Sequence, residues 1–136
     1  GSMGYGLPAA GSAKLAHPER AVVCLAGDGC FQMSMQEFGT AVQYGANIIV
    51  IVVNNGVYGT IRMHKQKTYP DRPSGTDIRN PDFAALARSY GGFGATITKT
   101  DQFADAFAAA RAAHAPAILD VQTDPRAVTT RSSTAF

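Results

Sequence analysis

The chain has 136 residues, of which 46% are hydrophobic, so it is long enough to form one domain with a core of its own. Twelve basic and ten acidic side chains give a formal net charge of +2, a balance that argues against nucleic acid or an acidic membrane as a partner. No apolar run approaches the roughly 20 residues that span a bilayer and no signal peptide is recognisable, so we expect a cytoplasmic protein.

Helices and strands alternate along the first half of the chain. Residues 7–17 predict an alanine-rich helix. Residues 21–26 and 47–53 are short apolar runs rich in Val and Ile, which are typical of strands buried on both faces of a parallel sheet. Between them, apolar residues spaced three and four apart predict a helix over 33–44, and Gly45 is expected to end it.

The second half continues the alternation after an irregular stretch. Residues 65–80 carry two prolines and many polar side chains, and we expect either a mobile lid or a solvated connector. The remaining elements are a helix over 81–90 that Asn80 caps, a strand over 93–98, a helix over 102–113 and a strand over 117–122. This alternation predicts a single-domain α/β fold with three α/β/α layers and a mainly parallel sheet.

Two polar motifs follow the first two predicted strands, and 24 residues separate them: Gly27-Asp28-Gly29 and Asn54-Asn55. Ligands of parallel sheets bind beyond the carboxyl ends of the strands, so we expect Asp28 and Asn55 to meet there. A carboxylate oxygen and an amide oxygen suit Mg²⁺, which usually also takes phosphate oxygens and water. The pair of motifs therefore predicts a metal–diphosphate site. Asn54 is expected to hydrogen-bond its own backbone and so to fix the turn.

Longer segments around these motifs carry a family resemblance. The stretches GSMGYGLPAA, GDGCFQMSMQEFGTAVQYG and VVNNGVYGTIRMH resemble the carboxy-terminal, thiamine-diphosphate-binding domain of the acetolactate synthase, benzoylformate decarboxylase and pyruvate decarboxylase superfamily. The likeness runs from residue 3 to about residue 125. It implies thiamine diphosphate and Mg²⁺ as cofactors, and an enzyme that cleaves or forms a carbon–carbon bond next to the carbonyl of a 2-oxo acid or an aldehyde.

The resemblance also assigns roles to single residues. Asp28, Asn55 and the main-chain carbonyl of Val57 are the implied ligands of Mg²⁺. Met3 is either an expression remnant or start residue, or the apolar wedge that bends the coenzyme between its two rings. The expected cofactor-binding residues are Gly27, Asp28, Gly29, Cys30, Asn55, Val57, Tyr58 and Gly59. The family usually has a small residue such as serine where this chain has Cys30, but a cysteine keeps the backbone N–H that would face a phosphate at the start of a helix.

Enzymes of this family are several times longer than this chain, with this domain last. We therefore expect a fragment, with the cofactor-binding domain over 1–128 and a loose tail over 129–136. The family's catalytic glutamate belongs to a separate pyrimidine-binding domain, often of the partner subunit, and no segment here matches that domain. The resemblance thus implies a homo-oligomeric full-length enzyme, weak coenzyme affinity and no turnover for this chain alone.

The alternative is a non-catalytic, Rossmann-like module that binds a nucleotide or a phosphate. Residues 4–6 (GYG) faintly resemble a glycine-rich dinucleotide loop, but they follow no strand in this chain, as such a loop requires. An autonomous oligomerisation domain is a third, less specific hypothesis.

Overall fold

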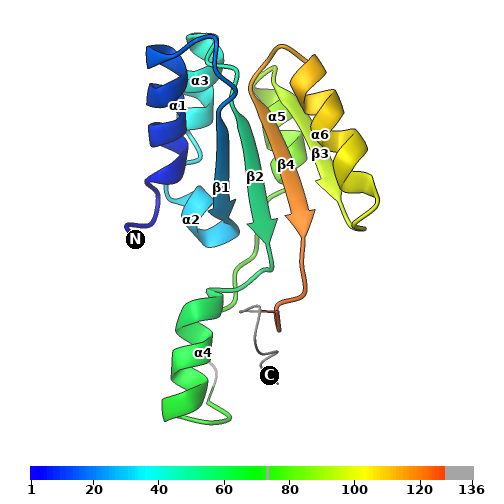
Figure 1. Ribbon diagram of the computed structural model, residues 1–136. Helices are drawn as coiled ribbons and strands as arrows, with labels where there is room; N and C mark the ends of the chain where they lie inside the picture. The colour runs from blue at the N-terminus through cyan, green and yellow to red at the C-terminus, as the bar shows by residue number, and fades with distance from the viewer. Residues whose placement is uncertain (73, 128–136) are drawn as a thin grey trace.

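A computed structural model describes residues 1–72 and 74–127, and within them four strands form one sheet. The strands are β1 (Val23–Gly27), β2 (Ile49–Asn54), β3 (Phe93–Ile97) and β4 (Ala117–Gln122). Their order in the sheet is β1-β2-β4-β3, and every neighbouring pair is parallel (Figure 1). The expected loose tail over 129–136 lies outside the described residues.

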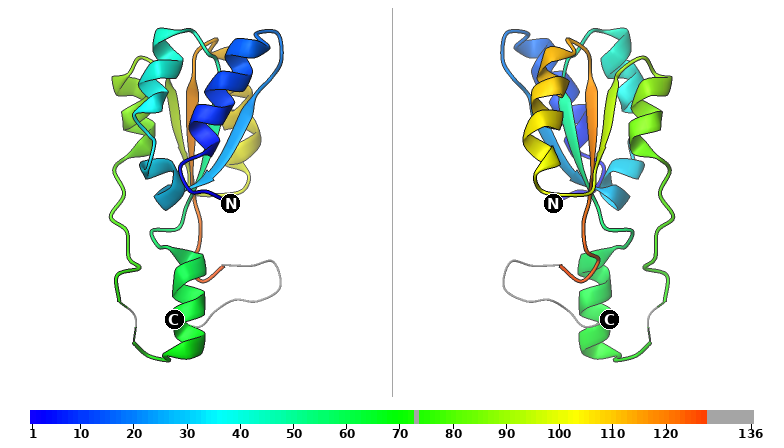
Figure 2. Two further views of the ribbon diagram at one scale, coloured as in Figure 1. Left: turned by 90° about the vertical axis from the view of Figure 1, so that its left-hand side faces the viewer. Right: turned by 90° about the vertical axis from the view of Figure 1, so that its right-hand side faces the viewer.

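Helices cover both faces of this sheet. Their bounds are α1 (Gly6–Ala16), α2 (Asp28–Gln32), α3 (Glu37–Gln43), α4 (Gly59–Thr68), α5 (Phe83–Ser89) and α6 (Gln102–Ala112). The first three and α5 pack on one face, while α6 packs over β3 and β4 on the other (Figures 1 and 2). These layers confirm the predicted α/β/α architecture with a parallel sheet. No helix within the described residues combines the length and apolar character needed to cross a bilayer.

Alternate residues of each strand supply two cores, as expected for a sheet covered on both sides. On the face towards α5, the buried rings of Phe31 and Phe83 pack in a T-shaped arrangement. Their centroids lie 5.3 Å apart, and the rings are nearly perpendicular. This contact fixes α2 against α5. Towards α6, Leu119 and Ile97 are buried under Phe107. Burying each such side chain contributes about 1.5–3 kcal/mol to folding.

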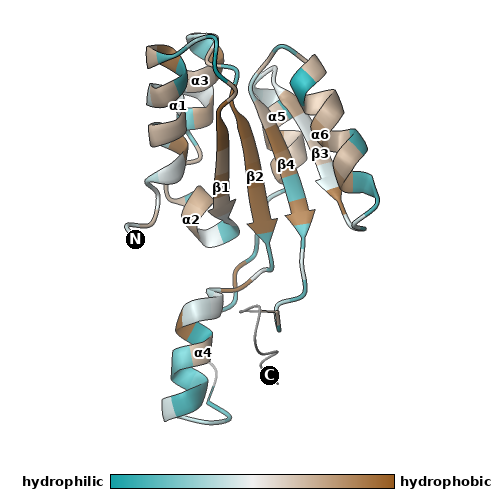
Figure 3. Cartoon of the chain, viewed as in Figure 1, coloured by the Kyte–Doolittle hydropathy of each residue, from teal (hydrophilic) through white to brown (hydrophobic). Residues whose placement is uncertain are grey.

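One edge of the sheet is less well covered. On the face opposite α1, Val23 and Leu25 of β1 are 46% and 71% exposed, because α6 packs chiefly over β3 and β4 and does not extend across β1. Figure 3 shows β1 and β2 as strongly hydrophobic, whereas α4, which projects beyond the carboxyl ends of the strands, is mostly hydrophilic and buries no residue.

The sequence placed most elements correctly but missed details at the carboxyl edge. The predicted helix over 33–44 is wrong as one element, because residues 33–36 are turns between α2 and α3. The predicted irregular stretch over 65–80 is wrong at its start, because α4 continues to Thr68. Gly45 does end α3, with a positive φ of 63°.

The cap of α5 was also assigned to the wrong residue. Asp82, not Asn80, caps this helix, because its carboxylate accepts a hydrogen bond from the backbone N–H of Ala85 at 2.7 Å. The Asn80 side chain instead reaches the carboxyl edge of the sheet.

Gly94 on β3 provides a test of how closely α5 packs on the sheet. A Cβ atom at this position would lie 2.1 Å from the carbonyl oxygen of Ala84, so Gly94→Ala is expected to destabilise the fold by about 1–3 kcal/mol. A Cβ at Gly11 on α1 would meet nothing within 4 Å, so the control Gly11→Ala should stabilise the helix by up to about 1 kcal/mol. Urea unfolding measures both, and equal effects would contradict the close packing.

Candidate functional site

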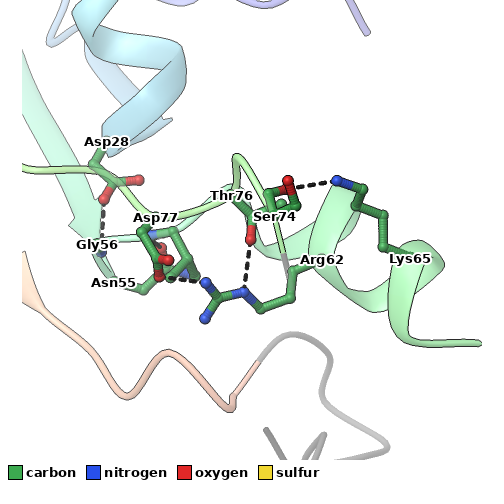
Figure 4. A network of polar contacts seen from close by, with 9 residues as sticks. Asp28, Asn55, Gly56, Arg62, Lys65, Ser74, Thr76 and Asp77 are labelled. Atoms are coloured by element: carbon green, nitrogen blue, oxygen red, sulfur yellow. Dashed lines mark hydrogen bonds and ion pairs between the residues drawn. The ribbon is translucent and has the colours of Figure 1, made fainter. Parts of the chain in front are cut away.

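The carboxyl ends of β1 and β2 converge on Asp28. This residue begins α2 directly after β1, and its side chain is only 3% exposed. The turn after β2 lies against it, because the backbone N–H of Gly56 donates a hydrogen bond to Asp28 Oδ2 at 2.8 Å (Figure 4). Asn55 precedes that glycine, so the two predicted side-chain ligands come from adjacent strand ends that are joined by a hydrogen bond.

Donors surround the Asp28 carboxylate. The backbone N–H of Gly29 donates to Oδ1 at 2.8 Å, while the N–H of Gly56 and the Nδ2 of Asn80 donate to Oδ2 at 2.8 and 2.7 Å. Such hydrogen bonds to a charged acceptor are stronger than neutral ones, and they offset the cost of burying a carboxylate. Gly56 has a φ of 68°, a left-handed conformation that favours glycine at this turn.

All the cofactor residues that were predicted from the sequence line one cavity of about 340 Å³. The predicted members are Met3, Gly27, Asp28, Gly29, Cys30, Asn55, Val57, Tyr58 and Gly59. The sequence did not single out the others, which include Val53, Thr60 and Ile61. A larger depression of about 520 Å³ lies at the amino ends of the strands, beside Lys14 and His114, and contains none of the predicted residues.

Glycine at position 29 is required by the wall of this cavity. A Cβ atom there would lie 2.4 Å from Cε1 of the Tyr58 ring and 3.0 Å from Ile78 Cδ1. The backbone of α2 therefore approaches Tyr58 more closely than any side chain would allow. Position 27 differs, because a Cβ on Gly27 would meet no atom within 4 Å.

The turn between α2 and α3 holds Met3 at the rim of the cavity. The backbone N–H of Gly4 donates to Cys30 Sγ at 3.2 Å, and Ser34 Oγ donates to the carbonyl of Gly4 at 2.8 Å. Met3 is 42% exposed and lines the cavity. Cys30 therefore contributes through its side chain as well, because its sulfur accepts a hydrogen bond from the backbone of Gly4.

The segment between α4 and α5 is tied to the same edge of the sheet. The backbone N–H of Tyr58 donates to the carbonyl of Thr76, and the N–H of Ile78 donates to the carbonyl of Gly56, both at 2.8 Å. Arg62 on α4 donates to Thr76 Oγ1 at 2.9 Å and pairs with Asp77 (Figure 4). The backbone of residues 76–78 is therefore fixed to the edge of the sheet, while the choice between a mobile lid and a solvated connector for 65–80 stays a prediction.

Comparisons with known proteins agree with this geometry. Residues 1–121 match the family model described as "Thiamine pyrophosphate enzyme, C-terminal TPP binding domain". The chain belongs to this family. It is also 43% identical over 124 residues to an acetolactate synthase of Arthrospira platensis, covering 90% of this chain and 21% of the relative. The acetolactate synthase large subunit of Haemophilus influenzae is 47% identical over 103 residues, covering 75% of this chain and 18% of that protein.

A solved structure has the same fold as this thiamine-diphosphate-binding domain. The thiamine diphosphate-dependent 4-hydroxybenzoylformate decarboxylase of Rhodococcus jostii RHA1 superposes with a TM-score of 0.83 at 37% identity, covering 90% of this chain and 23% of that one. The domain thus spans about a fifth of the length of the relatives that it matches.

Asn54, the last residue of β2, and Asn55, which follows it, divide the roles differently from the prediction. It is Asn55 whose side-chain oxygen accepts from the backbone N–H two residues on, at Val57, at 3.0 Å. Asn54 is only 7% exposed and instead donates its Nδ2 to Asp120 Oδ1 at 2.9 Å, while its Oδ1 accepts from Asn80 at 2.7 Å. The prediction that Asn54 bonds its own backbone is therefore wrong, because the side chains of Asp120 and Asn80 engage its amide.

Sequence reasoning missed Asn80 and Asp120 as members of the site. Asp120 could have been noticed in the sequence, because it is a single acidic residue inside the apolar strand β4. Its carboxyl is 3% exposed, and its pKa is raised above the ordinary aspartate value, chiefly because burial disfavours the charged form. Hydrogen bonds from Asn54 and Gln122 oppose this rise in pKa, and the carboxylates of Asp82 and Asp28 add to it.

Asp120→Asn is expected to remove a pH dependence of stability. An acid with a higher pKa in the folded state than in the unfolded one binds more protons when folded, so its contribution to stability is lost as pH rises from the unfolded pKa through the folded pKa. The free energy of unfolding of Asp120→Asn relative to the wild type should therefore rise with pH across that window. The rise is about 1.4 kcal/mol for each unit of pKa difference.

Urea unfolding at a series of pH values measures this difference. A difference between Asp120→Asn and the wild type that stays flat with pH would contradict the raised pKa.

The two glycines beside Asp28 give a matched pair for the cavity wall. Gly29→Ala is expected to displace the Tyr58 ring, because the new methyl carbon would overlap it, and Gly27→Ala should leave the ring in place. The ring resonances of Tyr58 in NMR spectra report the displacement. An unchanged Tyr58 in Gly29→Ala would show that the ring does not cover this glycine.

Proposed function

We propose that this domain binds the diphosphate of thiamine diphosphate through Mg²⁺. The observation that supports this proposal most strongly is the cavity that Asp28, Asn55 and Val57 line together. Asp28 is buried there, at the junction of two strand ends. Carboxylate, amide and carbonyl oxygens form the hard donor set that Mg²⁺ prefers. The open space beside Gly27 and the exposed rim at Met3 fit a coenzyme that lies along this wall.

The proposed roles follow from the chemistry of each group. Asp28 supplies the negative charge for the cation, and Asn55 and the carbonyl of Val57 supply neutral oxygens. The backbone of Gly29 and Cys30 would hold the phosphate end, and Met3 would pack against the coenzyme between its two rings. When bound, thiamine diphosphate supplies a nucleophilic carbon and an electron sink for the cleavage or formation of a carbon–carbon bond next to a carbonyl.

The wider setting is part of the same proposal. Because the chain spans about a fifth of its relatives' length, we place it as one domain, over 1–128, of a longer cytoplasmic and homo-oligomeric enzyme. A pyrimidine-binding domain of the same or a partner subunit would supply the catalytic glutamate. The substrate class is a 2-oxo acid or an aldehyde, as in a lyase or transferase of the acetolactate synthase type.

Thiamine diphosphate together with Mg²⁺ is expected to stabilise the chain, since a ligand that binds only the folded state adds about 1.4 kcal/mol at ten times its Kd. The shift in melting temperature should vanish in EDTA and in Asp28→Asn, which replaces a charged ligand by a neutral one. Differential scanning fluorimetry measures the shift for each protein against its own unliganded baseline.

Asp105→Asn is the matched control and should keep the full shift, because this aspartate lies on exposed α6. Titrations with NAD and with ATP test the alternative of a nucleotide-binding module. A larger shift with either nucleotide than with thiamine diphosphate would reject the proposed function in favour of that alternative.

Purified alone, the 136 residues are expected to show no turnover, because we assign the catalytic glutamate to a pyrimidine-binding domain that no segment of them resembles. A steady-state assay of CO₂ release from pyruvate and from benzoylformate, with coenzyme and Mg²⁺ present, measures this. Sustained release above the Asp28→Asn background would overturn the assignment of the glutamate to another domain.

A further inference from the structure

We propose that Asn80 and Asp120 are positioning residues that hold the Asp28 carboxylate in place for its cation, through a directional chain of hydrogen bonds. This inference rests on the proposed function of Asp28. Neither residue lines the cavity in which the predicted cofactor residues meet, so each would act through a neighbour.

The chain of contacts joins two buried carboxylates through two asparagines. Asn80 Nδ2 donates to Asp28 Oδ2 and to Asn54 Oδ1, each at 2.7 Å. Asn54 Nδ2 then donates to Asp120 Oδ1 at 2.9 Å. Gln32 Nε2 donates to Asn80 Oδ1 at 2.6 Å, so both ends of the Asn80 amide have partners.

The chemistry of the ends fixes the direction of the chain. A carboxylate only accepts hydrogen bonds, so Asn54 must turn its NH₂ group towards Asp120 and its oxygen towards Asn80. Asn80 must then present its NH₂ group to that oxygen, and the same group reaches Asp28. If the Asn80 amide were reversed, its oxygen would face the carboxylate of Asp28, which is unfavourable. Asp28 and Asp120 therefore favour the same orientation of the Asn80 amide, and Asp120 reinforces, through Asn54, the orientation that donates to Asp28.

Burial makes these contacts strong. Asp28, Asn54 and Asp120 are 3%, 7% and 3% exposed, so water competes little with their hydrogen bonds. A polar group left unpaired at this depth is costly, so the chain has one well-satisfied arrangement rather than several.

The backbone also brings Asn80 to this place. Ile78 pairs with Gly56 through its N–H, and Asp82 caps α5, whose first residue, Phe83, is buried against Phe31. Asn80 lies between these two anchors. Its position is therefore set from both sides, and its side chain bridges the ends of β1 and β2.

Binding of thiamine diphosphate with Mg²⁺, measured by isothermal titration calorimetry on the full chain, tests the proposal. Asn80→Ala and Asp120→Leu should each weaken binding about 10–100-fold, the usual cost of removing a residue that orients a metal ligand. Asp120→Asn keeps an oxygen for Asn54 and should restore most of the binding that Asp120→Leu loses. Phe107→Ala removes a side chain from the core on the opposite face of the sheet, under α6, and should bind like the wild type, so it controls for lost stability.

A double variant separates a connected chain from two independent effects. If Asp120 acts through Asn80, then adding Asp120→Leu to Asn80→Ala should weaken binding little further. Independent losses that multiply would overturn the proposed connection.

A second measurement reports the chain without any ligand. Both N–H protons of the Asn80 side chain are hydrogen-bonded, so they should exchange slowly with solvent in NMR spectra. Asp120→Leu should speed that exchange, and Phe107→Ala, in the core on the other face of the sheet, should leave it slow. Unchanged protection in Asp120→Leu would overturn the inference.

The outcomes separate the two proposals. If the wild type binds and both Asn80→Ala and Asp120→Leu bind equally well, the positioning role is wrong and the proposed function stands. If the wild type does not bind thiamine diphosphate with Mg²⁺, the proposed function fails and this inference fails with it.

Discussion

The structure depends on how one carboxylate is buried where two strands end. Asp28 lines the cavity but is only 3% exposed, so the backbone N–H groups of Gly29 and Gly56 and the side chain of Asn80 replace most of its contacts with water. These donors belong to three separate parts of the chain. Satisfying one charge therefore fixes the start of α2, the turn after β2 and the segment before α5 relative to one another.

The packing of the hydrophobic core supports the same junction. Phe31 on α2 meets Phe83 on α5, so the helix that begins at Asp28 is held by the element that follows Asn80. Tyr58 lies over Gly29 on the cavity side. Apolar contacts on one side and hydrogen bonds on the other thus leave α2, which has only five residues, little freedom to shift. That rigidity is what a short-range cation site needs from its scaffold.

Local patterns in the sequence were sufficient for most of the architecture, and together with the family resemblance they pointed to many, though not all, of the residues that line the cavity. Buried strands read as apolar runs, and GDG and NN mark the ends of two of them. The sequence was not sufficient where a contact with a residue far along the chain determines the local structure. Residues 33–44 have helical spacing, yet Ser34 turns to bind Gly4, and the helix is interrupted. Asn80 precedes a proline and a helix, so a cap was the natural local prediction, but Asp28 and Asn54 engage its amide instead.

The exposed side of β1 has a consequence for handling the isolated domain. Among the described strands β1 pairs with β2 alone, and its other edge leaves backbone hydrogen-bonding groups beside the uncovered side chains of Val23 and Leu25. An apolar strand with an unpaired edge is a template onto which another chain can add. We therefore expect concentrated preparations of this domain to self-associate. Leu25→Lys would place a charge beside the unpaired edge and should keep the domain monomeric.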